Sequence, residues 1–129
     1  MVEGPELEDF MDAHELAGQV SEIRTSGFKQ STRKGIQKLA GIVEDSRDFD
    51  DPYRLAAFIL IEAINRHAFN DGNHRTAWIV AKKVLRRNNE EMRVEEIKSF
   101  DEIERDLKSE VKFKNVGQVA NWIRTSDFE

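Results

Sequence analysis

The sequence predicts an all-α protein built around one buried central helix. Three observations predict this fold class. Apolar residues recur with helical spacing along most of the chain, Gly, Asp, Asn or Ser separate the segments that carry them, and one segment, "LAAFILI" at 55–61, is apolar on every side. Because the chain has 129 residues and no linker rich in Pro, Gly and Ser, we expect a single domain over residues 1–129.

The first two predicted helices follow the i, i+3, i+4, i+7 rule. The apolar stripe of the first contains Leu7, Phe10, Met11 and His14, where we expect the histidine to be structural. The stripe of the second contains Ile36, Leu39, Ala40 and Val43. Between them, the segment from Arg24 to Gly35 is polar and has a turn glycine, so we expect a loop or a short β-hairpin there, before the core.

The central helix has a well-marked start. Asp51 is a good N-cap residue, and Pro52 follows at the first helical position, where its missing N–H costs nothing. A strand is the alternative for so apolar a run, but the run continues to His67, which is longer than most strands. We therefore predict a helix that ends near His67.

Three more helices follow in the pattern. One begins at Asn73 or His74 and turns Ala77, Val80, Ala81 and Val84 inward. Another follows a Ser99 cap and carries Phe100, Ile103 and Leu107. The last follows Asn115 and carries Val116, Val119, Ala120 and Ile123.

Composition excludes several classes of function. The chain has no cysteine, which excludes disulfides and thiolate chemistry. Its formal net charge of −5 argues against direct nucleic-acid binding, which needs an excess of Lys and Arg on one face. It has neither a signal-peptide pattern nor a run of ~18 apolar residues, so we expect a cytoplasmic protein without a membrane partner.

The stretch "INRHAFNDGNHRTAW", at 64–78, gathers reactive groups between the central helix and the next one. The free N–H groups at the start of the helix that begins at Asn73 or His74 would form an anion pocket. Gly72 would let the backbone approach the anion. Arg75 would bind phosphate oxygens, and Asp71 offers a carboxylate for a cation such as Mg²⁺. His67, at the end of the buried helix, could accept a proton from an incoming hydroxyl. Together these groups predict transfer of a phosphate-containing group from a nucleotide.

The same residues resemble a known family. "HAFNDGNHR" is similar to the H-x-F-x-D/E-G/A-N-x-R signature of Fic/Doc (Fido) proteins, and the likeness continues into "TAWIVAKKVLRRNN". The resemblance implies a Fido-type helical bundle that transfers part of a nucleoside triphosphate, such as ATP, to a hydroxyl of a target protein, with Mg²⁺. It also implies that a translation factor is a plausible target.

Roles for individual residues follow from this resemblance. It implies that His67 is the general base, that Phe69 is a buried anchor and that Asp71 binds Mg²⁺. The implied anion hole and phosphate site comprise Gly72, Asn73, His74 and Arg75. A flap that pairs with the target would comprise Thr25, Ser26, Gly27, Phe28, Lys29, Gln30 and Ser31.

Two positions depart from the AMP-transferring members of the family. Those members have Gly where His74 stands and a second Arg where Trp78 stands. Doc-like (death-on-curing) toxins also lack the second Arg, and for them the resemblance implies transfer of the terminal phosphate. We therefore expect a Doc-like, toxin-type protein kinase, with AMP transfer (adenylylation) as the alternative.

Other interpretations of the cluster remain open. His67, Asp71 and His74 could ligate zinc in a metal-dependent hydrolase, although a turn separates them. A catalytically dead Fido domain that only binds is a second alternative. Restraint by a separate antitoxin-like protein is favoured over self-inhibition, because "TSDFE" at 125–129 is only a partial match to the inhibitory pattern S/T-x-x-x-E-G/N.

Overall fold

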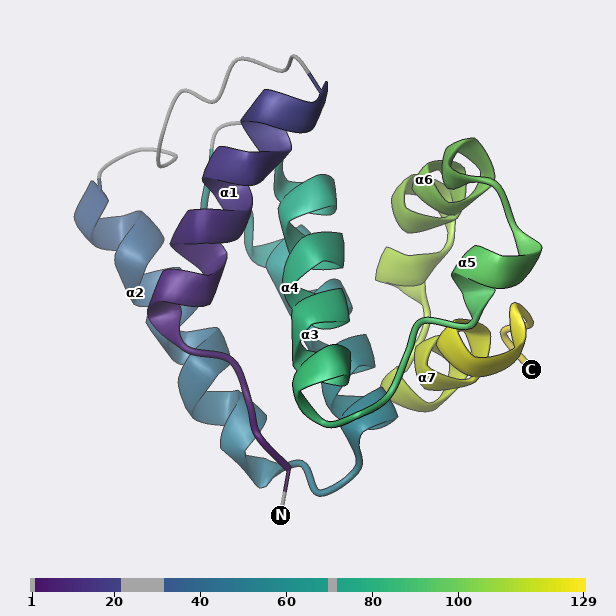
Figure 1. Ribbon diagram of the computed structural model, residues 1–129. Coiled ribbons are helices and arrows are strands. Elements are labelled where there is room, and N and C mark those ends of the chain that lie inside the picture. The colour runs from purple at the N-terminus through teal and green to yellow at the C-terminus, as the bar shows by residue number, and fades with distance from the viewer. Residues whose placement is uncertain (1, 22–31, 70–71) are drawn as a thin grey trace.

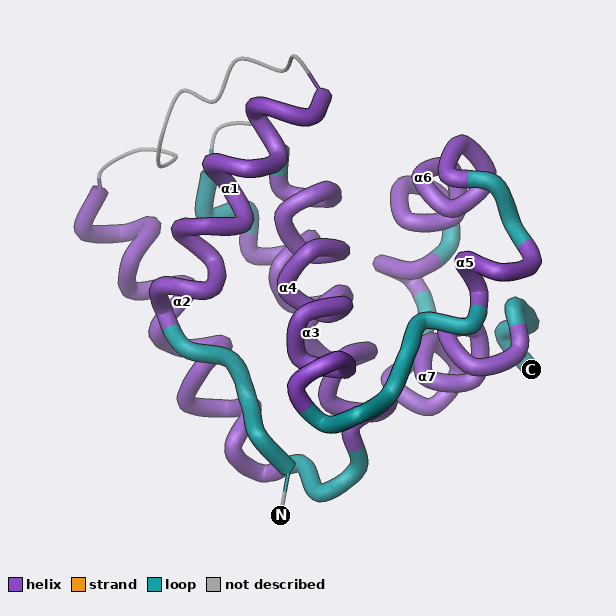
Figure 2. The backbone as a smooth tube through the Cα atoms, in the orientation of Figure 1, coloured by secondary structure: helices purple, strands orange, loops and turns teal. Residues whose placement is uncertain are grey.

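The computed structural model describes residues 2–21, 32–69 and 72–129. These residues form seven α-helices and two 3-10 turns, and no strand. The helices are α1 (Leu7–Ser21), α2 (Thr32–Asp45), α3 (Pro52–Arg66), α4 (Asn73–Arg87), α5 (Val94–Ile97), α6 (Phe100–Ser109) and α7 (Val116–Thr125). The 3-10 turns are η1 (Ser46–Asp48) and η2 (Val111–Phe113). The all-α prediction is confirmed for the described part of the chain, as Figure 2 shows by its lack of strand colour.

Helix α3 lies at the centre of the packing. It contacts α2, α4 and α7, while α1 packs across α4 and α2. In Figure 1, α1 to α4 form one group and α5 to α7 form a second group beside it. Helix α6 of the second group contacts α4, so the two groups meet next to the helix that follows the reactive cluster.

The predicted central helix is buried along most of its length, as its apolar run requires. Its buried residues are Leu55, Ala56, Ala57, Ile59, Leu60, Ile61, Ala63 and Ile64. The Asp51 carboxylate accepts a hydrogen bond from the Tyr53 N–H at 3.1 Å, which confirms the predicted N-cap. The Ser99 and Asn115 caps are also confirmed, and each forms a reciprocal capping box with the residue three positions on.

An ion pair with a buried carboxylate, Asp9, holds α1 on α4. The two terminal nitrogens of Arg87 donate to the two Asp9 carboxylate oxygens, at 3.0 Å each, and Lys83 lies 3.5 Å from the same carboxylate. Burial raises the pKa of Asp9, but hydrogen bonds from Arg87 and the Glu6 N–H, with the positive charges of Arg87 and Lys83, bring it below its usual value. This pair fixes the face of α4 against which the N-terminal helix packs.

Part of the polar segment that precedes the core is helical. The segment from Arg24 to Gly35 is not all loop, because α2 begins at Thr32 and includes Gly35. Helix propensity at a glycine is poor, by about 1 kcal/mol relative to alanine, but Gly35 is buried, and packing of the helix outweighs that cost. The predicted flap, Thr25 to Ser31, lies outside the described residues.

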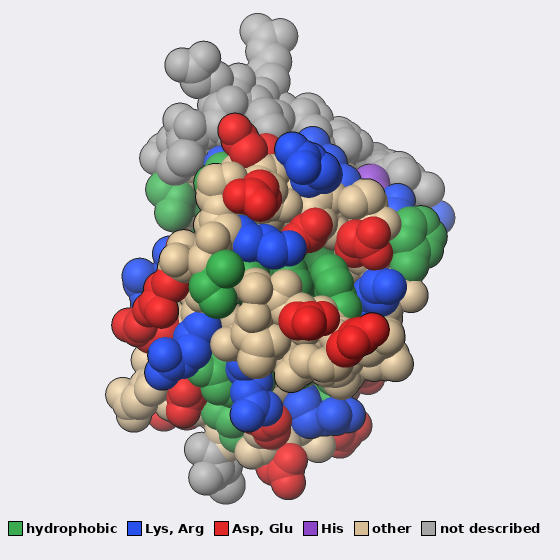
Figure 3. All heavy atoms as spheres, turned by 90° about the vertical axis from the view of Figure 1, so that its right-hand side faces the viewer, with side chains coloured by type: hydrophobic (Ala, Val, Ile, Leu, Met, Phe, Trp, Pro, Cys, Tyr) green, Lys and Arg blue, Asp and Glu red, His purple; other side chains and the backbone are tan. Residues whose placement is uncertain are grey.

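The surface on the α5–α7 side carries mixed charges. Figure 3 shows acidic and basic side chains interspersed there, with small hydrophobic areas between them. None of the described helices is both long and apolar enough to cross a membrane.

Candidate functional site

His67 stands at the point where the central helix stops. It is the C-cap of α3, with φ 50° and ψ 60°, in the left-handed region, and its side chain is exposed. A left-handed conformation costs a non-glycine residue roughly 1–2 kcal/mol, so the surrounding turn must hold it in place. The result is an imidazole presented to solvent at the end of a rigid, buried helix.

Asn73 holds this turn together from the first position of α4. Its side-chain oxygen accepts from the Phe69 N–H at 3.2 Å, and its amide nitrogen donates to the Phe69 carbonyl at 2.8 Å. The same amide nitrogen lies 3.4 Å from Nδ1 of His67, a long contact whose direction depends on the imidazole tautomer. Asn73 is buried, so it braces the turn from inside.

Phe69 anchors the turn in the core. Its side chain is 2% exposed and stacks on His14 of α1, with ring centroids 3.7 Å apart and planes 7° apart. This geometry is consistent with the anchor role suggested for Phe69 and with the structural role expected for His14.

Gly72 is the N-cap residue of α4, and it provides no side-chain hydrogen bond to the helix start. It has φ 74°, which favours glycine, and its carbonyl accepts the Thr76 N–H at 2.9 Å. A Cβ added at Gly72 would come no closer than 3.6 Å to His14, so the backbone angle and not lack of space requires the glycine. The first N–H groups of α4 therefore receive no hydrogen bond from a capping side chain at Gly72.

A cavity of about 190 Å³ opens at this helix start. It is lined by Gly72, His74, Arg75, Glu104 and Lys108, so α4 and α6 form its walls together. A terminal nitrogen of Arg75 donates to the Glu104 carboxylate at 3.2 Å, and its guanidinium lies 4.5 Å from the centre of the Phe100 ring. The Arg75 Nε is buried and has no hydrogen-bond partner in the described structure.

His74 lines this cavity, and its surroundings lower its pKa and so favour the neutral imidazole. Burial lowers its pKa below the usual value, and the positive charges of Lys108, His67 and Lys112 lower it further, whereas Glu104 acts in the opposite direction. A neutral imidazole can donate one hydrogen bond to an anion without adding charge.

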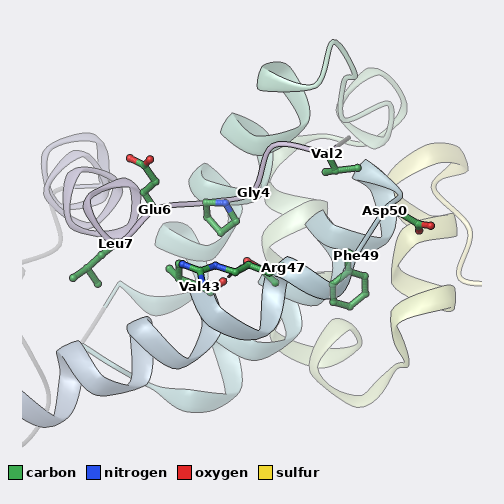
Figure 4. Close-up of a pocket in the computed structure, with 10 residues that line it drawn as sticks. Val2, Gly4, Glu6, Leu7, Val43, Arg47, Phe49 and Asp50 are labelled. Carbon is green, nitrogen blue, oxygen red and sulfur yellow. Dashed lines mark hydrogen bonds between the residues drawn. The ribbon is translucent and has the colours of Figure 1, made fainter.

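A larger cavity, of about 580 Å³, lies at the opposite end of α3 (Figure 4). The N-terminal segment from Val2 to Leu7 passes over the end of α2 there, with Val43, Arg47 and Phe49 beneath it. Its lining residues lie before α3 in the chain, whereas His67 follows the last residue of that helix. None of the predicted site residues lines it.

The structure brings most of the described candidates together. Gly72, His74 and Arg75 line one cavity, whereas Asn73 lies beneath the turn and contacts His67. Asp71 lies outside the described residues, and within those residues no three His, Cys, Asp or Glu side chains form a metal site. The zinc alternative, which requires Asp71, therefore stays a prediction.

Sequence reasoning missed the contribution of α6. Phe100, Glu104 and Lys108 recur every four residues and so lie along one face of that helix, next to α4. The spacing is visible in the sequence, but nothing local indicates that this face meets the reactive cluster.

Comparison with known proteins agrees with the motif. A profile of the Fic/DOC family matches residues 7–85, which run from α1 into the last turn of α4. No curated protein and no solved structure matched the chain. The match covers more than half of the sequence, and the chain belongs to the Fic/DOC family. Membership implies nucleotidyl or phosphoryl transfer to proteins, for which members generally use a nucleoside triphosphate and Mg²⁺.

Proposed function

We propose that this protein transfers the terminal phosphate of a nucleoside triphosphate, such as ATP, to a hydroxyl of a target protein. The observation that carries the proposal is the junction of α3 and α4, where an exposed imidazole lies beside an uncapped helix start with Arg75 in its first turn. A helix terminus can hold phosphate groups and an adjacent imidazole can accept a proton, so together they can support phosphoryl transfer.

His67 would serve as the general base. An unprotonated ring nitrogen accepts the proton of the target hydroxyl, and the oxygen then attacks the γ-phosphorus. The bond from that phosphorus to the bridging oxygen breaks, and the nucleoside diphosphate leaves with the bridging oxygen. The hydrogen bonds of Asn73 to Phe69 would keep the imidazole in one position. A fixed base favours the reaction, because the rate of phosphoryl transfer depends on how the reacting groups are oriented.

The phosphates would be held by the first N–H groups of α4, by His74 as a neutral donor and by Arg75. Asp71 has the right ligand chemistry for Mg²⁺, which when bound would neutralise charge on the phosphates. The segment Thr25 to Ser31 remains the proposed target-binding flap.

Trp78 supports terminal phosphate transfer over AMP transfer. It is 5% exposed and packs edge-on against Trp122, with ring centroids 5.9 Å apart, so it belongs to the core and cannot grip phosphates. AMP-transferring relatives carry a second Arg at this position. Because this chain has Trp78 there, it lacks the arginine contact that would hold the outer phosphates while the α-phosphate reacts.

The partners are also proposals. We propose a cytoplasmic target protein, with a translation factor as the first candidate, and a separate antitoxin as the restraint. The pattern "TSDFE" supports a separate restraint, because α7 ends at Thr125 and the rest of the pattern is not helical.

Position-specific labelling tests the reaction. Purified protein and Mg²⁺ would be added to host lysate with ATP labelled on the α- or the γ-phosphate. We expect a protein band labelled from the γ-position only, and a drop of about 10²-fold to 10⁴-fold for His67→Ala. Because His67 is exposed, the variant should unfold at the same urea concentration as the parent protein.

The other outcomes distinguish the alternatives. Label from the α-position only would mean AMP transfer by the same site. Label from neither position, with several nucleotides, would support a binding domain without activity. An active His67→Ala protein would overturn the assignment of the base, and tightly bound stoichiometric zinc would favour the hydrolase.

A further inference from the structure

Helix α6 forms one wall of the cavity, and this helix lies outside the residues that the family profile matches. The match ends at residue 85, and α6 begins at Phe100 with a capping box that fixes its first turn. Its contact with α4 places Glu104 and Lys108, one helical turn apart, at the cavity. The family match therefore says nothing about these two side chains, and their role must be argued from the structure.

The charges around the cavity do not cancel. Arg75 and Glu104 form an ion pair and offset one another, while the lowered pKa of His74 favours its neutral form. Lys108 remains, and it makes no ion pair with any described residue. Two other lysines of this region are paired, Lys98 with Asp106 at 2.6 Å and Lys114 with Glu110 at 3.5 Å, and neither of them lines the cavity.

The charge of Lys108 also acts inside the cavity. Among the charged groups that lower the pKa of His74, Lys108 has the largest effect, ahead of His67 and Lys112. An ammonium group that disfavours a second positive charge there must favour a negative one, by the same electrostatic interaction.

The size of the cavity limits what can enter it. Its volume of about 190 Å³ is below the roughly 300–1,000 Å³ of sites that enclose a drug-sized ligand. Phosphate groups can occupy it, whereas the nucleoside must lie outside. Helix α4 contributes Arg75 as a cationic lining residue, and α6 contributes Lys108.

We propose that Lys108 is a second cationic ligand of the nucleotide's phosphates, opposite Arg75 in the cavity between α4 and α6. This inference rests on the proposed function, since it names a ligand of the same site. It also explains how a chain with Trp78 in its core can hold a polyphosphate by two cations, one from each helix.

Binding measurements on the full chain test this role. Calorimetry would compare ATP with Mg²⁺, inorganic tripolyphosphate and adenosine as ligands for the parent protein and for Lys108→Ala. We expect the variant to bind ATP and tripolyphosphate roughly 5- to 30-fold more weakly, since a charge-assisted hydrogen bond is lost. Adenosine has no phosphate and should not distinguish the two proteins, while Lys108→Arg should retain most of the affinity.

Lys112→Ala is the matched control. Lys112 also carries a charge near His74, but it does not line the cavity and its ammonium lies 5.1 Å from the centre of the Phe113 ring. Its removal should change ATP affinity less than about twofold, because a charge that does not touch the ligand acts only through a field that salt screens. An equal loss in both variants would mean a general field effect, and would overturn a specific role for Lys108.

The remaining outcomes separate the two proposals. If Arg75→Ala weakens ATP binding and Lys108→Ala does not, the role of Lys108 is wrong and the proposed function stands. If the parent protein binds neither ATP nor tripolyphosphate, both are wrong.

Discussion

Asn73 shows how one buried side chain shapes the candidate site. It satisfies both backbone groups of Phe69 and touches the ring of His67, so it connects the core anchor to the exposed imidazole. The backbone of His67 is in the left-handed region, a conformation that only a well-determined turn maintains. The position of the proposed base therefore depends on a residue that does not line the cavity.

His74 should make stability depend on pH. Its folded-state pKa is lowered, first by burial, so as the pH falls through the usual histidine pKa the unfolded chain binds more protons than the folded chain. The free energy of unfolding should fall as the pH decreases through about 6.5, the usual pKa of histidine. Urea unfolding at pH 7.5, 6.5 and 5.5 would measure this loss.

His74→Gln is the comparison for that pH series. The variant cannot take up the proton, so its stability should decline less over the same range. The Asp9 carboxyl, whose pKa is lowered, loses its contribution only at more acidic pH and is common to both proteins. Parallel stability curves for the two proteins would contradict the prediction.

At the scale of the elements, α6 controls the guanidinium that α4 offers to an anion. Arg75 is held by Glu104 and by the Phe100 ring, both from α6. A phosphate entering the cavity competes with the Glu104 carboxylate for Arg75 and is repelled by its charge. Helix α6 thus supplies one group that favours the anion, Lys108, and one that opposes it.

Glu104→Gln should therefore tighten binding of ATP. The carboxylate is partly exposed, so a gain of roughly 2- to 5-fold in affinity is expected from losing the competition, since surface ion pairs are worth up to about 1 kcal/mol. Phe100 still holds the guanidinium in the variant. Calorimetry with ATP and Mg²⁺ measures the effect, and Glu110→Gln, away from the cavity, controls for the loss of one negative charge. Weaker binding would show instead that Glu104 positions Arg75 for the phosphate.

At the scale of the whole molecule, Trp122 joins the two helix groups. It is fully buried on α7 and contacts Trp78 of α4 edge-on. It also stacks on Phe128, with ring centroids 5.3 Å apart. Its Nε1 donates to the Asp106 carboxylate of α6 at 3.3 Å. Trp122 therefore ties α6 to the helices that carry the cluster.

Trp122→Ala should lower the free energy of unfolding by about 3–5 kcal/mol, because it leaves a large cavity in the core and removes the hydrogen bond to Asp106. Urea denaturation would measure this loss. Phe113→Ala is the control, because Phe113 is 74% exposed and its removal should change stability by less than about 0.5 kcal/mol. Similar midpoints for Trp122→Ala and the parent protein would show that α7 is not part of the cooperative core.

Much of the fold could be predicted because its signals are local. Helix period, the Asp51, Ser99 and Asn115 caps and the turn at Gly72 each depend on residues within about one turn of the chain. The motif from His67 to Arg75 is equally compact, so its residues are neighbours in any fold that places a helix on either side. The start of α2 was predicted too late, because packing of Gly35 overrides its poor helix propensity.

The sequence by itself thus determined six of the seven described α-helices, all but the short α5, together with the family motif and the candidate base and phosphate-binding residues. Only the tertiary structure decided which side chains of α6 face the phosphate-binding candidates. Arg75 and Glu104 are 29 residues apart, and nothing in the period of either helix sets how α6 is placed against α4. That placement comes from long-range packing through Trp122 and the core, which is why Glu104 and Lys108 became visible at the cavity only in the folded chain.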